Sequence, residues 1–323
     1  MKRRQVFIMI ILFFLGFTAC GKTENTGTEN GNGIQCMLTI SDGSDAFRAM
    51  LVEAAQTAAE EAGMELTVMD AEGSTENQMN QIKNANSYDV IICALCDNGM
   101  AQEMEALAGD KPMVFINSCP EEDYLEANKY IYVGSDEAVA GNLQAEYILE
   151  KYAEKNTLNI VMIKGEKMHS ATKGRTRAVK AKLEASGKEI HYVFDDYADW
   201  STDTANNMFQ LFLKTGQDVD CVISNNDSMA IGIVQAAKEN NLSLENLPIL
   251  GVDATEEGLN AVAANEMACT IFQPAVGQGQ AAVKAAIRMV KKESIASLEG
   301  AEDELYVWVP FEAVTKNNVK NYQ

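Results

Sequence analysis

The sequence predicts an α/β protein of two doubly wound parallel-sheet lobes that are joined by three hinge crossings. Two observations support this fold class. Short apolar strands alternate with amphipathic helices along most of the chain, which is typical of parallel sheets covered on both faces. The plan also occurs twice, because DVIICALCDNGM at residues 89–100 matches DCVISNNDSMAIG at residues 220–232.

The first half of the chain shows this alternation clearly. Its helices are expected where apolar residues recur at intervals of three and four, and its strands where short apolar runs lie between turn residues. The expected strands are 37–40, 64–69, 89–95 and 113–116, and the expected helices are 46–62, 75–85 and 98–107.

The pattern begins again after Tyr132-Val133-Gly134. The expected helices are 141–155, 170–185, 202–213 and 228–240, and the expected strands are 159–163, 190–194, 219–223 and 248–252. We expect the chain to cross between the lobes near 133–136, 272–275 and 307–311. Residues 34–134 plus 274–308 would then form one lobe, and residues 135–273 plus 309–323 the other.

The first 33 residues predict export and a membrane anchor. Lys2, Arg3 and Arg4 precede an apolar run at 6–15, which is too short to cross a bilayer and has the length found in signal peptides. The run ends at Thr18-Ala19-Cys20, which resembles a lipoprotein signal of residues 1–20 with Cys20 as the lipidated residue. An ordinary cleaved signal with an incidental cysteine is the alternative.

Residues 21–33 read GKTENTGTENGNG and contain no apolar side chain, so we expect a flexible tether. A lipid anchor followed by a tether suggests an extracytoplasmic protein on a cell membrane, more typical of a Gram-positive surface than of a Gram-negative periplasm. The membrane would be contacted only through the anchor.

Composition excludes several classes of protein. Hydrophobic residues make up 47% of the chain and charged residues 23%, as in soluble globular proteins. The formal net charge is −21, and loss of three signal-peptide cations takes it to −24, which argues against nucleic acid or anionic lipid as a partner.

Cysteine placement and missing motifs argue against a metal, a cofactor or catalysis. Most of the six cysteines after Cys20 lie in apolar runs and are expected as buried thiols, although the CxxC spacing of Cys93 and Cys96 leaves a redox pair open. No GxSxG elbow, P-loop or GxGxxG follows the expected strands, so we predict a protein that is not an enzyme.

Polar and aromatic residues follow the carboxyl ends of the expected strands. In parallel sheets these ends meet at one edge, where ligands bind. The residues at these positions are Asp45, Phe47, Asn117, His169, Trp200, Asn226 and Asp253. Amide and carboxylate side chains pair with sugar hydroxyls, and aromatic rings pack on the apolar faces of a sugar ring. The combination predicts a monosaccharide site in a cleft between the lobes.

Each of these residues also has a structural interpretation. Asp45 and Asp253 could cap the helices that follow them. Phe47 and Trp200 could belong to the core, and Arg175 could be solvated beside Lys173. His191 lies within an expected strand and is not assigned to the site.

Most of the chain from Cys36 onward resembles the type I periplasmic sugar-binding proteins, the solute-binding components of ABC transporters, and among them the galactose/glucose-binding members. The resemblance is carried by VMIKGEKMHSATKGRTR, DYADWSTDTA, ISNNDSMAIG and LGVDA, with YVGSD and VFINSCP as further landmarks. It implies capture of a monosaccharide, most closely galactose or glucose, and its delivery by a monomer to the permease and ATPase of an ABC importer. A chemoreceptor would be a further partner.

The resemblance also implies the ligand-binding set. It adds Arg175 and Gln273 to the seven residues above. Phe47 and Trp200 would sandwich the ring, Asp253 and Asn226 would bind its hydroxyls, and Arg175 would reach the anomeric side. His169 and Asn117 would bind the exocyclic hydroxymethyl group.

The chain departs from the galactose/glucose pattern at three places. Ala171 replaces an acidic residue, Gln273 replaces an asparagine, and residues 150–158 lack the oxygen-rich spacing of a calcium loop, so no calcium is expected there. These changes leave the identity of the sugar open. The alternative function is a sensor for another small sugar, a signalling furanose or a nucleoside that feeds a chemoreceptor or a sensor kinase.

Overall fold

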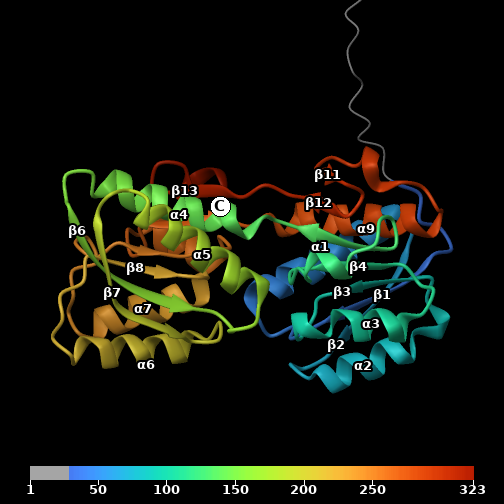
Figure 1. Cartoon of the computed structure of the whole chain (residues 1–323), viewed down its shortest axis with the longest axis horizontal. Helices are drawn as coiled ribbons and strands as arrows, with labels where there is room; N and C mark the ends of the chain where they lie inside the picture. The colour runs from blue at the N-terminus through green and yellow to red at the C-terminus, as the bar shows by residue number, and fades with distance from the viewer. Residues whose placement is uncertain (1–28) are drawn as a thin grey trace, which may run out of the picture.

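The computed structural model describes residues 29–323, and Figure 1 shows two α/β lobes side by side. Within these residues, the first lobe contains a seven-stranded sheet in the order β11-β12-β5-β4-β3-β1-β2, in which all neighbours except β11 and β12 run parallel. The strands are β1 (Gln35–Ile40), β2 (Glu65–Asp70), β3 (Val90–Cys93), β4 (Met113–Ile116), β5 (Tyr130–Gly134), β11 (Ala301–Glu302) and β12 (Tyr306–Trp308). The helices are α1 (Ala46–Ala62), α2 (Thr75–Lys83), α3 (Ala101–Ala108) and α9 (Ala275–Val290).

The second lobe repeats this plan. In the described part of the chain its sheet has six strands in the order β13-β10-β9-β8-β6-β7, all parallel except the β10–β13 pair. The strands are β6 (Thr157–Lys164), β7 (Glu189–Tyr197), β8 (Cys221–Ser224), β9 (Ile249–Leu250), β10 (Cys269–Phe272) and β13 (Glu312–Thr315). The helices are α4 (Glu137–Lys151), α5 (Ser170–Glu184), α6 (Thr202–Leu213), α7 (Asp227–Glu239) and α8 (Glu256–Ala263).

Each sheet is covered on both faces by a layer of helices. In the first lobe, α1 and α9 pack on one face, and α2 and α3 on the other. In the second lobe, α4 and α5 pack on one face while α6, α7 and α8 pack on the opposite one. Strands such as β3, β4 and β8 are therefore buried along their whole length, which explains their continuous apolar sequences. The predicted fold class is confirmed.

The chain passes between the two sheets three times, as predicted. The passages lie between β5 and α4, between β10 and α9, and between β12 and β13. Ser135 ties them together, because its Oγ donates to the Val309 carbonyl (2.5 Å) and accepts from Gln278 Nε2 (2.9 Å). One hydroxyl thus joins the first and third crossing segments to the start of α9, which follows the second.

Several element boundaries differ from the sequence prediction for local reasons. Helix α4 begins at Glu137 rather than at residue 141, because the Asp136 side chain caps it by accepting from the Ala138 amide. Gly141 lies inside this helix, where a Cβ atom would stand 2.3 Å from the Arg175 carbonyl oxygen of α5. The expected helix at 98–107 begins with a 3₁₀ turn, η2 (Asn98–Met100).

The signal peptide of residues 1–20, Cys20 and the tether up to residue 28 lie outside the described residues. The end of the expected tether packs on the first lobe. Gly31 donates its amide hydrogen to the Ala62 carbonyl (2.7 Å), and Glu29 pairs with Arg288 (2.8 Å). Because a Cβ at Gly31 would lie 2.8 Å from Met64 Cβ, this contact requires glycine.

The six cysteines in residues 29–323 are all free thiols. Cys36, Cys93, Cys221 and Cys269 are fully buried, as expected from their apolar neighbours. Burial also raises the pKa of the partly buried Cys96 thiol to about 11, so this residue stays protonated at neutral pH. Among residues 29–323, no helix combines the length and apolar character needed to cross a bilayer.

Helix α9 crosses α1 at Gly279, where a Cβ atom would lie 2.7 Å from the Ala55 nitrogen. We expect Gly279→Ala to lower the free energy of unfolding by about 1–3 kcal/mol, because backbone of α1 has to move. Gly277→Ala on the same helix is the control. Its Cβ meets the movable Val309 side chain at 3.0 Å, so stability should stay within about 1 kcal/mol of the original. Urea unfolding measures both, and equal losses would contradict the predicted backbone contact.

Candidate functional site

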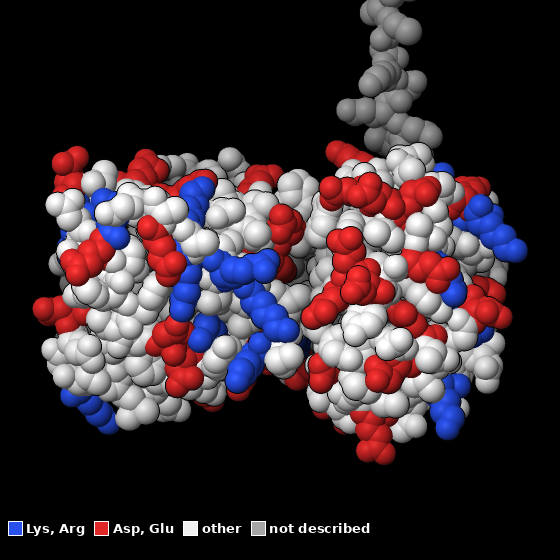
Figure 2. All heavy atoms as spheres, viewed as in Figure 1, with Lys and Arg blue, Asp and Glu red and all other residues white. Residues whose placement is uncertain are grey.

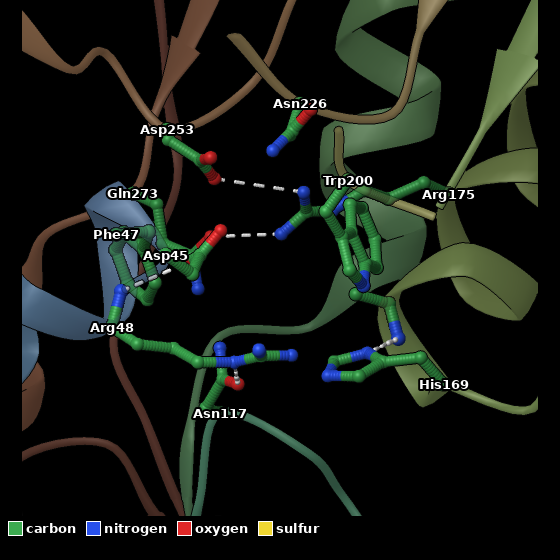
Figure 3. Close-up of a pocket in the computed structure, with 11 residues that line it drawn as sticks. Asp45, Phe47, Arg48, Asn117, His169, Arg175, Trp200, Asn226, Asp253 and Gln273 are labelled. Carbon is green, nitrogen blue, oxygen red and sulfur yellow. Dashed lines mark hydrogen bonds and ion pairs between the residues drawn. The ribbon is translucent and has the colours of Figure 1, made fainter. Parts of the chain in front are cut away.

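The nine residues proposed from sequence line one cavity between the lobes (Figure 3). Arg48 and Ala171 complete the lining of this cavity. Strand ends position these residues as expected: Asn117 follows β4, Asn226 follows β8, and Gln273 follows β10. The structure brings every residue of the predicted set together, and it adds Arg48, which the sequence reasoning missed.

Three lining residues are held in place because they also cap helices. Asp45 Oδ1 accepts from the Arg48 amide (2.9 Å) at the start of α1, and Asn226 Oδ1 accepts from the Met229 amide (3.0 Å) at the start of α7. His169 Nδ1 accepts from the Ala171 amide (3.2 Å) at the start of α5. Asp45 therefore caps helix α1 and lines the cavity at the same time.

Asp253 does not cap the next helix, because Thr255 does so through the Gly258 amide (3.1 Å). Asp253 instead has φ of 114°, and Asn117 and Trp200 also lie at positive φ, with values of 60° and 65°. Backbone of this kind is unfavourable for a bulky side chain such as Trp, and it concentrates at functional sites.

Arg175 is buried at the centre of a polar network, so the solvated alternative is wrong. Its Nε donates to Glu137 Oε2 (2.6 Å), its Nη1 to the Asn225 carbonyl (2.6 Å) and its Nη2 to Gln273 Oε1 (2.7 Å). Asp253 Oδ1 lies 3.6 Å from Nη1. Burial raises the pKa of Glu137 and of Asp253, and the Arg175 charge opposes both shifts.

His169 is a neutral imidazole. Burial lowers its pKa well below the usual range, and the positive charges of Arg48 and Arg175 lower it further. Because Nδ1 accepts a hydrogen bond from Ala171, the ring proton is on Nε2. The ring meets the edge of Trp200 at a centroid distance of 5.3 Å.

Two aromatic rings reach the cavity from opposite lobes. Phe47 is 3% exposed, packs in the first-lobe core and also lines the cavity, so it occupies both environments considered for it, core and site. Trp200 lies against Gly165, where a Cβ atom would stand 2.2 Å from the indole ring. The glycine of the GEKMH segment is thus required for the position of the indole.

Arg48 is 5% exposed, and its Nε donates to Asn117 Oδ1 (3.3 Å). Its Nη2 lies 3.9 Å from Glu166 Oε1 of the second lobe. A signal for Arg48 existed in the sequence, because it stands next to Phe47 in the first turn of the helix that Asp45 caps. In residues 29–323, no cluster of three His, Cys, Asp or Glu side chains is placed to hold a metal.

The surface beside the groove between the lobes is polarised (Figure 2). On the face shown in Figure 2, Lys and Arg side chains gather on the second lobe beside the groove between the lobes. Asp and Glu side chains lie opposite them on the first lobe. The groove is therefore bordered by opposite charges on its two sides, although the whole chain is acidic.

A model of the family described as "Periplasmic binding protein domain" matches residues 37–294. The putative rhizopine-binding protein of Rhizobium meliloti is 33% identical over 81% of this chain and 83% of its own length. The D-galactose/methyl-galactoside binding periplasmic protein of Haemophilus influenzae is 28% identical over 80% and 82%. The structure of an ABC transporter solute-binding protein from Bacillus halodurans with bound myo-inositol superposes with a TM-score of 0.79 at 26% identity, covering 91% of this chain and 98% of that one.

Arg175→Met should lower the free energy of unfolding by about 3–5 kcal/mol, because Glu137 would be left buried without its cationic partner. Lys173→Met, at an exposed position of the same helix, is the matched control and should change stability by less than about 0.5 kcal/mol. Chemical denaturation compares the two. A loss below 1 kcal/mol in Arg175→Met would contradict the importance of this ion pair.

The neutral His169 predicts a pH dependence. Below the ordinary His value of 6.5 the unfolded chain protonates this residue while the folded protein does not, so acid favours unfolding. As the pH falls from 6.5, the free energy of unfolding of the original protein should decrease, relative to that of His169→Gln, by up to about 1.4 kcal/mol per pH unit. Well above pH 6.5 the residue is neutral in both states, and the difference should level off. Unfolding curves of both proteins from pH 7.5 to 5 measure this difference in stability. Parallel pH profiles would disprove the prediction.

Proposed function

This chain belongs to the type I periplasmic binding proteins, the sugar-binding components of ABC importers, and we propose that it binds a monosaccharide with a galactose-like or glucose-like ring. It is a binding protein rather than an enzyme, as its relatives are. The observation that carries the proposal is the cavity in which two aromatic rings and a set of amide and carboxylate groups converge from both lobes.

The chemistry of the cavity lining suits a sugar ring. Phe47 and Trp200 would pack on the two apolar faces of the ring. Asp253, Asn226 and Arg175 at one end of the cavity would bind ring hydroxyls, since carboxylates accept, guanidinium groups donate and amides do both.

Ligand binding would close the two lobes. We propose that each lobe moves as a unit about the three crossings. The first lobe would comprise residues 34–134 plus 274–308, and the second lobe residues 135–273 plus 309–323. In the structure the lobes already touch across the cleft, because the Cys119 amide donates to Ser170 Oγ (2.9 Å). A sugar that contacts both lobes favours this closed form, because it binds the closed form more tightly than an open one.

The closed form is the state that an ABC permease would recognise. The family places the chain outside the cytoplasm. We further propose that Cys20 carries a lipid anchor, that the protein acts as a monomer on a Gram-positive surface, and that a chemoreceptor is a second partner.

A panel of hexoses, hexuronates, pentoses and inositols tests the proposal by thermal shift and calorimetry on the full chain. A ligand at one hundred times its dissociation constant should stabilise the protein by about 2.7 kcal/mol. Trp200→Ala and Asp253→Ala should each weaken the affinity for this ligand at least tenfold. Trp308→Ala, which removes a tryptophan outside the cavity, is the matched control and should keep it.

Two outcomes would overturn parts of the proposal. A panel in which no carbohydrate stabilises the protein would reject the function. Retained affinity in both Trp200→Ala and Asp253→Ala would reject the site while leaving the family assignment intact.

A further inference from the structure

One end of the cavity presents hydrogen-bond donors that have no acceptor. The Arg48 side chain is 6% exposed, and its guanidinium group lines the cavity. Its Nε is bound to Asn117 Oδ1, but its two terminal nitrogens make no hydrogen bond within residues 29–323. The carboxylate of Glu166 is 3.9 Å from Nη2, beyond hydrogen-bond distance, and Glu166 does not line the cavity.

Three neighbouring side chains at this end also offer donors. The oxygen of Asn117 is used by Arg48, so its amide NH₂ group is left to donate. His169 accepts through Nδ1, and its Nε2 is buried with no partner in the described part of the chain. The indole Nε1 of Trp200 is a third buried donor, and the Glu166 carboxylate lies within its reach. Figure 3 shows the free nitrogen of His169 turned toward the Arg48 guanidinium.

The acceptors of the cavity lie elsewhere. Asp253 and Asn226 stand at the opposite end of the cavity from Arg48, Asn117 and His169 (Figure 3). Asp45 uses one carboxylate oxygen to accept from the Arg48 amide. Ala171, next to His169, is 3% exposed and lines the cavity where the galactose/glucose pattern has an acidic residue. The cavity lining thus has no carboxylate at this position.

This arrangement does not suit a hydroxymethyl group. A hydroxyl brings a hydrogen of its own that has to be donated, and Arg48, His169 Nε2 and Trp200 Nε1 cannot accept it. A carboxylate brings two acceptor oxygens and no hydrogen, and its geometry matches the two terminal nitrogens of a guanidinium. It would also neutralise the buried charge of Arg48.

We infer that the ligand carries a carboxylate which Arg48 binds, so that the preferred sugar is a hexuronate rather than the parent hexose. The inference rests on the proposed function and names the chemical class of its ligand. The sugar ring would lie between Phe47 and Trp200, with its exocyclic carboxylate directed at Arg48, Asn117 and His169. The ring hydroxyls would point to Asp253 and Asn226.

Calorimetric titration of the full chain with matched pairs tests the inference. The pairs are D-galacturonate with D-galactose and D-glucuronate with D-glucose. For the ring configuration that binds, we expect the uronate to bind at least tenfold more tightly than the hexose. The neutral uronamide should bind at least tenfold more weakly than the uronate, because its NH₂ group adds a donor.

Arg48→Met removes the guanidinium and keeps an apolar stem. It should weaken uronate binding at least tenfold more than it weakens hexose binding, which reverses or abolishes the preference. Arg48→Lys should give an intermediate loss. Glu166→Gln is the control near the same nitrogen and should retain uronate binding, because Glu166 lies outside the cavity lining.

The outcomes separate this inference from the function on which it rests. A hexose, pentose or inositol that binds as tightly as any uronate would overturn the inference and leave the sugar-binding function standing. Absence of binding by every carbohydrate would overturn both. If Arg48→Met does not fold, the ratio of uronate to hexose affinity in the unchanged protein still decides.

Discussion

The buried guanidinium of Arg175 is the interaction on which the site depends. It reaches from α5 to Glu137 at the start of α4, to the Asn225 carbonyl after β8 and to Gln273 at the second crossing. These segments are far apart in the chain, and a buried charge is tolerated only where its partners are held in place. The same group therefore joins one wall of the cavity to two of the three segments that connect the lobes.

The two ends of the cavity differ because of the residues that surround each arginine. Arg175 has carboxylate partners in Glu137 and Asp253, so its charge is satisfied within the protein. The Glu166 carboxylate near Arg48 is half-exposed and too far away for a hydrogen bond. The terminal nitrogens of Arg48 therefore remain able to donate to a group in the cavity. A buried charge with incomplete pairing is costly in a free protein, and a ligand that completes the pairing gains affinity from it. On the proposed function, polarity within the cavity rather than the net charge of the chain would decide which ligand binds.

Periodicity was sufficient for most of the fold but not for the elements after residue 252. The strands at 37–40 and 113–116 and the helix at 46–62 stood out because apolar runs and helical spacing were strong. Helix α9 was not predicted, since its glycines weaken the helical pattern, yet one of them is required by the close approach to α1. The strands after residue 264 are short and lie at or near sheet edges, where hydrophobic alternation is weak.

The sequence by itself determined which residues meet. Parallel strands bring their carboxyl ends to one edge, so Asp45, Asn117, Trp200 and Asp253 could be assigned to one cleft from their positions after strands. Tertiary structure alone decided how the charged groups in that cleft are paired. Burial of Arg175 and the unpaired donors of Arg48 depend on distances between segments that are remote in the chain, and spacing along a sequence does not contain those distances.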